Sequence, residues 1–136
     1  MQALLNEIRR TGLEVTVWTA RAAHFRQMAE GLRCPMAAPE RVKSSGGRSA
    51  MEDCTLAAVE AQERADMAAK RHMELVARAD GLIAQIPRRE WQDVLSLRYI
   101  AGMSADGIAE RLHISKRTYY RMHRSAMEAA GAIRDE

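Results

Sequence analysis

The sequence predicts an all-α protein. We expect a long helical hairpin or coiled coil over residues 1–86 and a helix-turn-helix domain over residues 87–136. Aromatic residues make up only 4% of the 136 residues and methionine occurs 9 times, which favours helices over a β-sandwich. Hydrophobic residues reach 47%, which is enough for a packed core and argues against general disorder. Two long segments also place apolar residues at alternating spacings of three and four, as helices do.

The first periodic segment predicts one helix over residues 2–32. Its apolar positions follow a heptad seam: Leu4, Ile8, Thr11, Val15, Trp18, Ala22, Phe25, Ala29 and Leu32. Pro35 and Pro39 end this helix, and the Ser-Ser-Gly-Gly run at 44–47 cannot sustain a new one. Residues 33–49 are therefore predicted to be a linker.

The second periodic segment predicts a helix over residues 50–86. Ser49 is a good N-cap, and Glu52 three residues later completes a capping box. The seam contains many alanines: Met51, Cys54, Ala58, Ala61, Ala65, Ala68, His72, Leu75, Ala79, Leu82 and Ile86. Because alanine fills little space, we expect antiparallel packing against the bulkier first helix, either within one chain or across a homodimer. His72 is expected to be a hydrogen-bonded core histidine, and Pro87 ends the helix and marks the domain boundary.

The sequence also argues against several classes of protein. No apolar stretch approaches 18 residues, so no membrane partner is expected, and the charged start at 1–10 does not resemble a signal peptide. Cys34 and Cys54 are too few for a disulfide framework or a four-cysteine zinc site. The sequence has no Ser/His/Asp cluster, metal-ligand spacing or glycine-rich phosphate loop. We therefore expect a reduced, cytoplasmic protein that is not an enzyme and uses neither a cofactor nor a metal.

Residues 88–130 have the spacing of a helix-turn-helix. We expect a helix over 88–101 that ends at Gly102, a short helix over 105–112 capped by Ser104, and a final helix over 116–130 capped by Ser115. The turn between the last two helices falls at 113–114, and His113 there must accept a tight, left-handed conformation. The residues predicted to face inward are Ile108, Ala109, Leu112, Ile114, Tyr119 and Met122.

The outward positions of the final helix are basic. Residues 111–127 contain five arginines and lysines and no acid, although the net charge of the chain is only +3. This pattern predicts that the helix reads the major groove of double-stranded DNA. Arg117 and Arg121 could each donate two hydrogen bonds to a guanine. Tyr120 could contribute a hydrogen bond through its hydroxyl, or an apolar contact between its ring and a thymine methyl. The remaining DNA-binding candidates are Ser115, Lys116 and Thr118 near the helix start, with Arg124, and His123 is expected to face the DNA side or solvent.

The motif Val94-Leu95-x-Leu-Arg98-Tyr99-x-x-Gly102-Met-Ser104-x-x-x-Ile108-Ala109-Glu110-x-Leu112-x-Ile114-Ser115-x-Arg117-Thr118-x-x-Arg121 resembles region 4 of sigma-70-type factors. The resemblance implies that Arg98 and Ser104 touch phosphates and that Lys116, Arg117, Tyr120 and Arg121 read bases. The longer arrangement is similar to small phage-encoded late-gene transcriptional activators of the RinA and ArpU kind. It implies a phage or prophage regulator that binds DNA, with RNA polymerase as a further candidate partner.

Two other classes of function remain open at this point. A phage assembly protein of the small-terminase type also joins a helix-turn-helix to an oligomerising helical segment, and an octamer-sized ring in solution would favour that class. A polymerase-binding interaction module would use the helix at 51–86, whose net charge is −3, as its contact surface. Binding to RNA polymerase without salt-sensitive DNA binding would favour the module.

Overall fold

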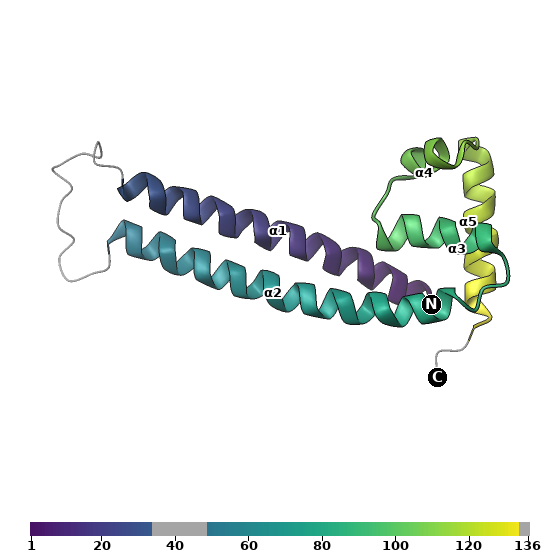
Figure 1. Ribbon diagram of the computed structural model, residues 1–136, viewed down its shortest axis with the longest axis horizontal. Helices are drawn as coiled ribbons and strands as arrows, with labels where there is room; N and C mark the ends of the chain where they lie inside the picture. The colour runs from purple at the N-terminus through teal and green to yellow at the C-terminus, as the bar shows by residue number, and fades with distance from the viewer. Residues whose placement is uncertain (34–48, 134–136) are drawn as a thin grey trace. The chain divides into compact units, whose positions relative to one another are not determined.

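The computed structural model describes residues 1–33 and 49–133, and it confirms the all-α class. Its elements are α1 (Gln2–Arg33), α2 (Ala50–Ile83), α3 (Arg89–Leu95), the π-helix η1 (Ser96–Ile100), α4 (Ala105–Leu112) and α5 (Lys116–Gly131) (Figure 1). The described ranges contain no strand and no helix that is long and apolar enough to cross a membrane. Most of the predicted linker, including Cys34, falls outside the described residues.

The contacts divide the chain into two compact units. Unit 1 consists of Met1–Gly12 and Lys70–Glu136, and unit 2 consists of Leu13–Ala69. This division differs from the boundary expected at Pro87, because unit 1 combines the ends of both long helices with α3, η1, α4 and α5. Independent folding of residues 87–136 therefore stays a prediction.

Unit 2 is a two-helix hairpin formed within one chain. Its α1 and α2 segments run side by side in opposite directions (Figure 1), and the buried positions are small seam residues: Ala22, Ala29, Ala58, Ala61, Ala65 and Ala68. Two guanidinium groups lie over the Trp18 ring, with the Arg21 Cζ 4.8 Å and the Arg64 Cζ 5.0 Å from the ring centroid. These are cation–π contacts, and the second joins α1 to α2. The predicted heptad seam is thus confirmed in this unit.

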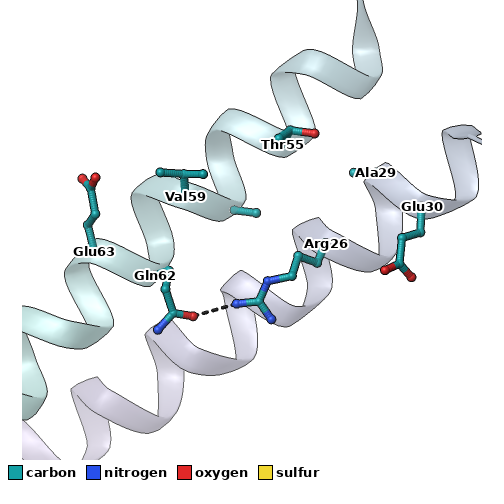
Figure 2. Close-up of a pocket in the computed structure, with 8 residues that line it drawn as sticks. Arg26, Ala29, Glu30, Thr55, Val59, Gln62 and Glu63 are labelled. Carbon is teal, nitrogen blue, oxygen red and sulfur yellow. Dashed lines mark hydrogen bonds between the residues drawn. The ribbon is translucent and has the colours of Figure 1, made fainter.

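A groove of about 460 Å³ lies between the helices of unit 2. It forms where Ala29 of α1 and Ala58 of α2 line the space between the helices, because a methyl group fills little of it. Figure 2 shows Arg26 reaching from α1 toward Gln62 of α2, and its Nη2 donates to Gln62 Oε1 at 2.7 Å. The hydrogen bond between Arg26 and Gln62 therefore joins the two helices at a place where few apolar side chains pack between them.

The α1 and α2 segments of unit 1 meet at a polar seam position. Thr11 is buried, and its hydroxyl donates to the Ile8 carbonyl at 3.0 Å. His72 Nδ1 lies 2.9 Å from the same hydroxyl oxygen, so the imidazole nitrogen is the donor once the threonine proton is used. Gly12 leaves room for the ring, since a Cβ there would lie 3.3 Å from His72 Cε1. The prediction of a hydrogen-bonded core histidine is confirmed.

The second long helix ends one turn earlier than predicted. The structure ends α2 at Ile83, and the amides of Gln85 and Ile86 form tighter bonds to carbonyls three residues back. The side-chain amide of Gln92 then donates to the Ile86 carbonyl at 2.7 Å. Pro87 excludes the preceding residue from the α conformation, and Gln92 supplies a donor for a carbonyl left without a helical partner.

The helix predicted over 88–101 is also different in the structure. It begins as α3 and widens after Leu95 into the π-helix η1, where the Ala101 amide bonds to the Ser96 carbonyl at 2.9 Å. Gly102 then takes a left-handed φ of 74°, which ends the helix as expected. A π-turn adds one residue to the helical repeat, which the spacing of apolar residues did not reveal.

Two apolar clusters fill unit 1. The first joins the ends of α1 and α2 to α3, η1 and α5: Leu4, Leu5, Ile8, Ala79, Leu82, Ile83, Ile86, Leu95, Tyr99, Ala126 and Ala130. The second holds α4 against α3 and α5: Val94, Ile108, Ala109 and Tyr119. The second cluster fixes the geometry of the candidate site.

Candidate nucleic-acid interface

The helix α4 has a defined cap at each end. Ser104 is the N-cap, and its Oγ accepts a hydrogen bond from the Gly107 amide at 3.1 Å. At the other end, the amide of His113 bonds to the Glu110 carbonyl and that of Ile114 bonds to the Ala109 carbonyl. These two bonds form a Schellman motif, which needs a left-handed residue after the helix. His113 fills that position with a φ of 57°, as predicted.

The helix α5 begins two residues after that turn. Ser115 caps it, accepting the Thr118 amide at 3.1 Å and donating to the Thr118 hydroxyl at 2.9 Å. The predicted sharp bend between Leu112 and Ser115 is therefore present. Both hydroxyls are engaged within the chain, so the local capping role accounts for Ser115 and Thr118 in this structure.

The inward side of the helix-turn-helix is apolar, as the spacing predicted. Ile108 is fully buried and Tyr119 is 2% exposed. Residues packed around them are half-buried: Leu97, Met103, Ala105, Leu112, Ile114 and Met122. Burial raises the pKa of the Tyr119 phenol, so the ring stays neutral inside the cluster. This packing fixes which side of α5 remains outside.

The outward side of α5 carries exposed arginines and one exposed tyrosine. Arg117, Arg121 and Arg124 are all exposed, and Tyr120 is 54% exposed although it is large and partly apolar. The Tyr120 ring lies edge-on to Tyr119, with 5.2 Å between ring centroids. Within the described residues, no acid lies at ion-pair distance from these three arginines. Four of the predicted site residues therefore share one accessible face.

Lys116 differs from the arginines, because it is paired with an acid. Its Nζ lies 3.0 Å from Asp106 Oδ1, and both side chains are largely exposed. The hydrogen bond to Asp106 raises the pKa of the lysine. The acid-free stretch was correctly read along the sequence, but the fold brings an acid from the first turn of α4 beside the first turn of α5. No periodicity links two residues ten positions apart across a turn, so sequence reasoning missed Asp106.

Arg98 occupies a different environment from the other site residues. It is half-buried in η1, and its Nη1 donates to the Met103 carbonyl at 3.1 Å. The resemblance placed Arg98 at a phosphate, whereas here its guanidinium binds the backbone just before Ser104. Ser104 itself is exposed at the start of α4.

The expectation that His123 faces DNA or solvent is wrong. The ring is half-buried, and its Nε2 lies 2.9 Å from the Tyr99 hydroxyl. Burial lowers the pKa of the imidazole, and the charge of Arg98 lowers it further. The heptad-like spacing of Tyr119, Met122 and Ala126 brings position 123 to the inner edge of α5, where the Tyr99 hydroxyl provides a partner.

The described residues include no group of three or more histidines, cysteines or acids that could hold a metal ion. The helices α4 and α5 are joined by a tight turn, and the outer face of α5 is cationic. The chain belongs to the family described as protein of unknown function (DUF1492), whose model matches residues 36–130. No curated protein and no solved structure matches the chain.

Proposed function

We propose that this protein is a sequence-specific DNA-binding transcription regulator that reads the major groove with the outer face of α5. The observation that supports this most is the coincidence of two independent features. Apolar packing turns Tyr119 inward, and the face opposite it carries Arg117, Arg121 and Arg124 without a paired acid among the described residues. A helix after a tight turn with such a face suits the docking of a recognition helix.

The residues of this face have the chemistry that base recognition needs. An arginine guanidinium donates two parallel hydrogen bonds to guanine O6 and N7, which distinguishes guanine from the other bases in the major groove. Arg117 and Arg121 lie four residues apart on α5, so they occupy the same face one turn apart. Tyr120 adds an exposed ring beside them. Arg124, one turn beyond Tyr120, suits a phosphate contact.

The resemblance to sigma-70 region 4 supports a finer proposal. A region-4-like helix-turn-helix joined to a long helical hairpin suits a phage or prophage late-gene regulator. Such a protein would bind double-stranded DNA and could engage RNA polymerase through another surface. The hairpin pairs α1 with α2 within one chain, so we propose that any homodimer forms through the outside of that hairpin.

The test is a selection of duplexes from a random pool with the full-length protein, followed by binding measurements across a salt series. We expect enrichment of one motif, and a plot of log affinity against log salt with a slope of about −0.9 per neutralised phosphate. Lys116→Ala should weaken selected and scrambled duplexes alike, since a lysine acts on phosphates as a point charge. Recovery of unenriched sequences, or affinity that does not depend on salt, would count against DNA binding.

A further inference from the structure

Arg98 is a cation directed into the protein near the entrance to the helix-turn-helix. Its guanidinium donates to the Met103 carbonyl and is half-buried. Its charge adds to the lowering of the His123 pKa by burial, and it opposes the rise that burial gives to the Tyr119 pKa. Tyr119 is one of the buried residues of the second apolar cluster, and it belongs to α5. Arg98 is therefore linked both to the backbone before α4 and to the inner face of α5.

The backbone that Arg98 binds is the segment that sets where α4 begins. The π-helix ends at Ile100, Gly102 reverses the chain with its positive φ, and the Met103 amide bonds to the Leu97 carbonyl at 2.9 Å. The Met103 carbonyl is the last one before Ser104, the N-cap of α4. A hydrogen bond from a charged donor is stronger than one between neutral groups, so this contact fixes the entry of α4 firmly.

We propose that Arg98 is a positioning residue, which holds the start of α4 so that α5 presents its outer face in one orientation. This inference rests on the proposed function and deepens it. It assigns Arg98 a role different from the phosphate contact that the resemblance implies. Arg98 in the π-helix donates from Nη1 to the Met103 carbonyl, and the half-buried guanidinium is held there rather than at a phosphate.

The first experiment compares Arg98→Met with a matched control, Arg111→Met, an exposed arginine in the last turn of α4. Affinity is measured for the selected and a scrambled duplex over a salt series, well below the unfolding temperature. Loss of a hydrogen bond to a charged donor predicts about a tenfold or larger loss for the selected duplex. The scrambled duplex should change by less than about twofold, and the salt slope should stay at the wild-type value.

A phosphate contact predicts a different result. Both duplexes would lose affinity in parallel, and the salt slope would fall by about 0.9. That outcome would overturn the inference and leave the proposed function standing. If Arg98→Met does not fold, Arg98→Gln replaces it, because glutamine keeps a donor and removes the charge. The same fall in slope for Arg98→Gln would again overturn the inference.

A second readout needs no DNA. The Ile108 amide bonds to the Ser104 carbonyl at 2.9 Å, so its hydrogen exchange reports the first turn of α4. We expect Arg98→Met to speed this exchange and to raise the pKa of His123, measured by NMR titration. The His123 ring packs against Tyr99 and Tyr119, and the positive charge of Arg98 contributes to lowering the pKa of His123. Unchanged exchange and an unchanged His123 pKa would refute the inference. Faster exchange in a protein that does not bind DNA would refute only the proposed function.

Discussion

At the scale of single residues, the structure separates the basic side chains of the site into two kinds. Arg117, Arg121 and Arg124 are exposed and have no acid beside them among the described residues. Lys116 and Arg98 are engaged within the chain, the first with Asp106 and the second with the Met103 carbonyl. The three exposed arginines are therefore available to bind DNA, whereas Lys116 and Arg98 already have partners within the protein.

Asp106 should compete with DNA phosphates for Lys116. We expect Asp106→Asn to tighten binding to any duplex, because the lysine is freed and a negative charge is removed from the face. An exposed ion pair is screened by solvent and contributes little, so we expect the affinity to rise by no more than about fivefold. Fluorescence anisotropy at fixed salt measures the change. Glu110→Gln is the matched control, since Glu110 is exposed on the same helix. An equal gain in both variants would show that only net charge matters.

His123 should make folding dependent on pH. Its pKa is lowered in the folded state, chiefly by burial and then by Arg98, so the unfolded chain binds the proton more readily. The stabilising contribution is therefore present above the ordinary value of 6.5 and is lost as the pH falls toward the lowered pKa.

Denaturant unfolding of the wild type and of His123→Gln, at a series of pH values from 7.5 downward, measures this effect. The difference between their free energies of unfolding should shrink over the window just described. A constant difference for His123→Gln would mean that the histidine does not titrate with folding.

At the scale of elements, the periodicity of apolar residues was sufficient to predict the helices and their inner faces. For example, Ala58, Ala65 and Ala79 are separated by one or two heptads in the sequence, and all three are buried in the structure. The π-helix at Ser96–Ile100 was not predictable, since a widened turn leaves the local composition unchanged. The end of α2 at Ile83 depends on Gln92, a partner from another helix. The spacing of apolar residues along the sequence therefore does not predict where α2 ends, because that end depends on a contact with another helix.

The turn between α4 and α5 should be strained by its histidine. His113 has φ 57° and ψ 45°, a left-handed conformation that costs a residue with a side chain roughly 1 kcal/mol. We expect His113→Gly to raise the free energy of unfolding by about 0.5–1 kcal/mol. Gly102→Ala, at the other left-handed position, should lower it by a similar amount, and thermal unfolding measures both. Destabilisation by His113→Gly would indicate that the imidazole makes a favourable contact in the turn.

At the scale of the whole molecule, unit 1 combines parts of the chain that are far apart in sequence. Its first apolar cluster includes Leu5 and Ile8 from α1, Ile83 at the end of α2, Ile86 just after it, and Leu95 from α3. A helix-turn-helix segment of residues 87–136 thus shares its core with the ends of the long helices. Heptad spacing does not show which ends of the long helices carry further contacts, so this shared core was not predictable from the sequence.

Residues 87–136 alone should be much less stable than the same residues in the full chain. Removing Leu5, Ile8 and Ile86 exposes the apolar surfaces of Leu95 and Tyr99, and each large buried side chain contributes about 1.5–3 kcal/mol. Circular dichroism and urea unfolding of the fragment measure this loss. A cooperative transition at the midpoint of the full chain would instead support the domain boundary predicted at Pro87.

The central claim is that the outer face of α5 reads bases, and Arg121 tests it most directly. Each base pair of the selected duplex is substituted in turn, and affinities are measured for the wild type and for Arg121→Ala. We predict that the variant loses about 1–3 kcal/mol on the selected duplex and loses its preference at one base pair, while the others keep theirs. An unchanged preference at every position would contradict the claim that this face of the helix reads bases.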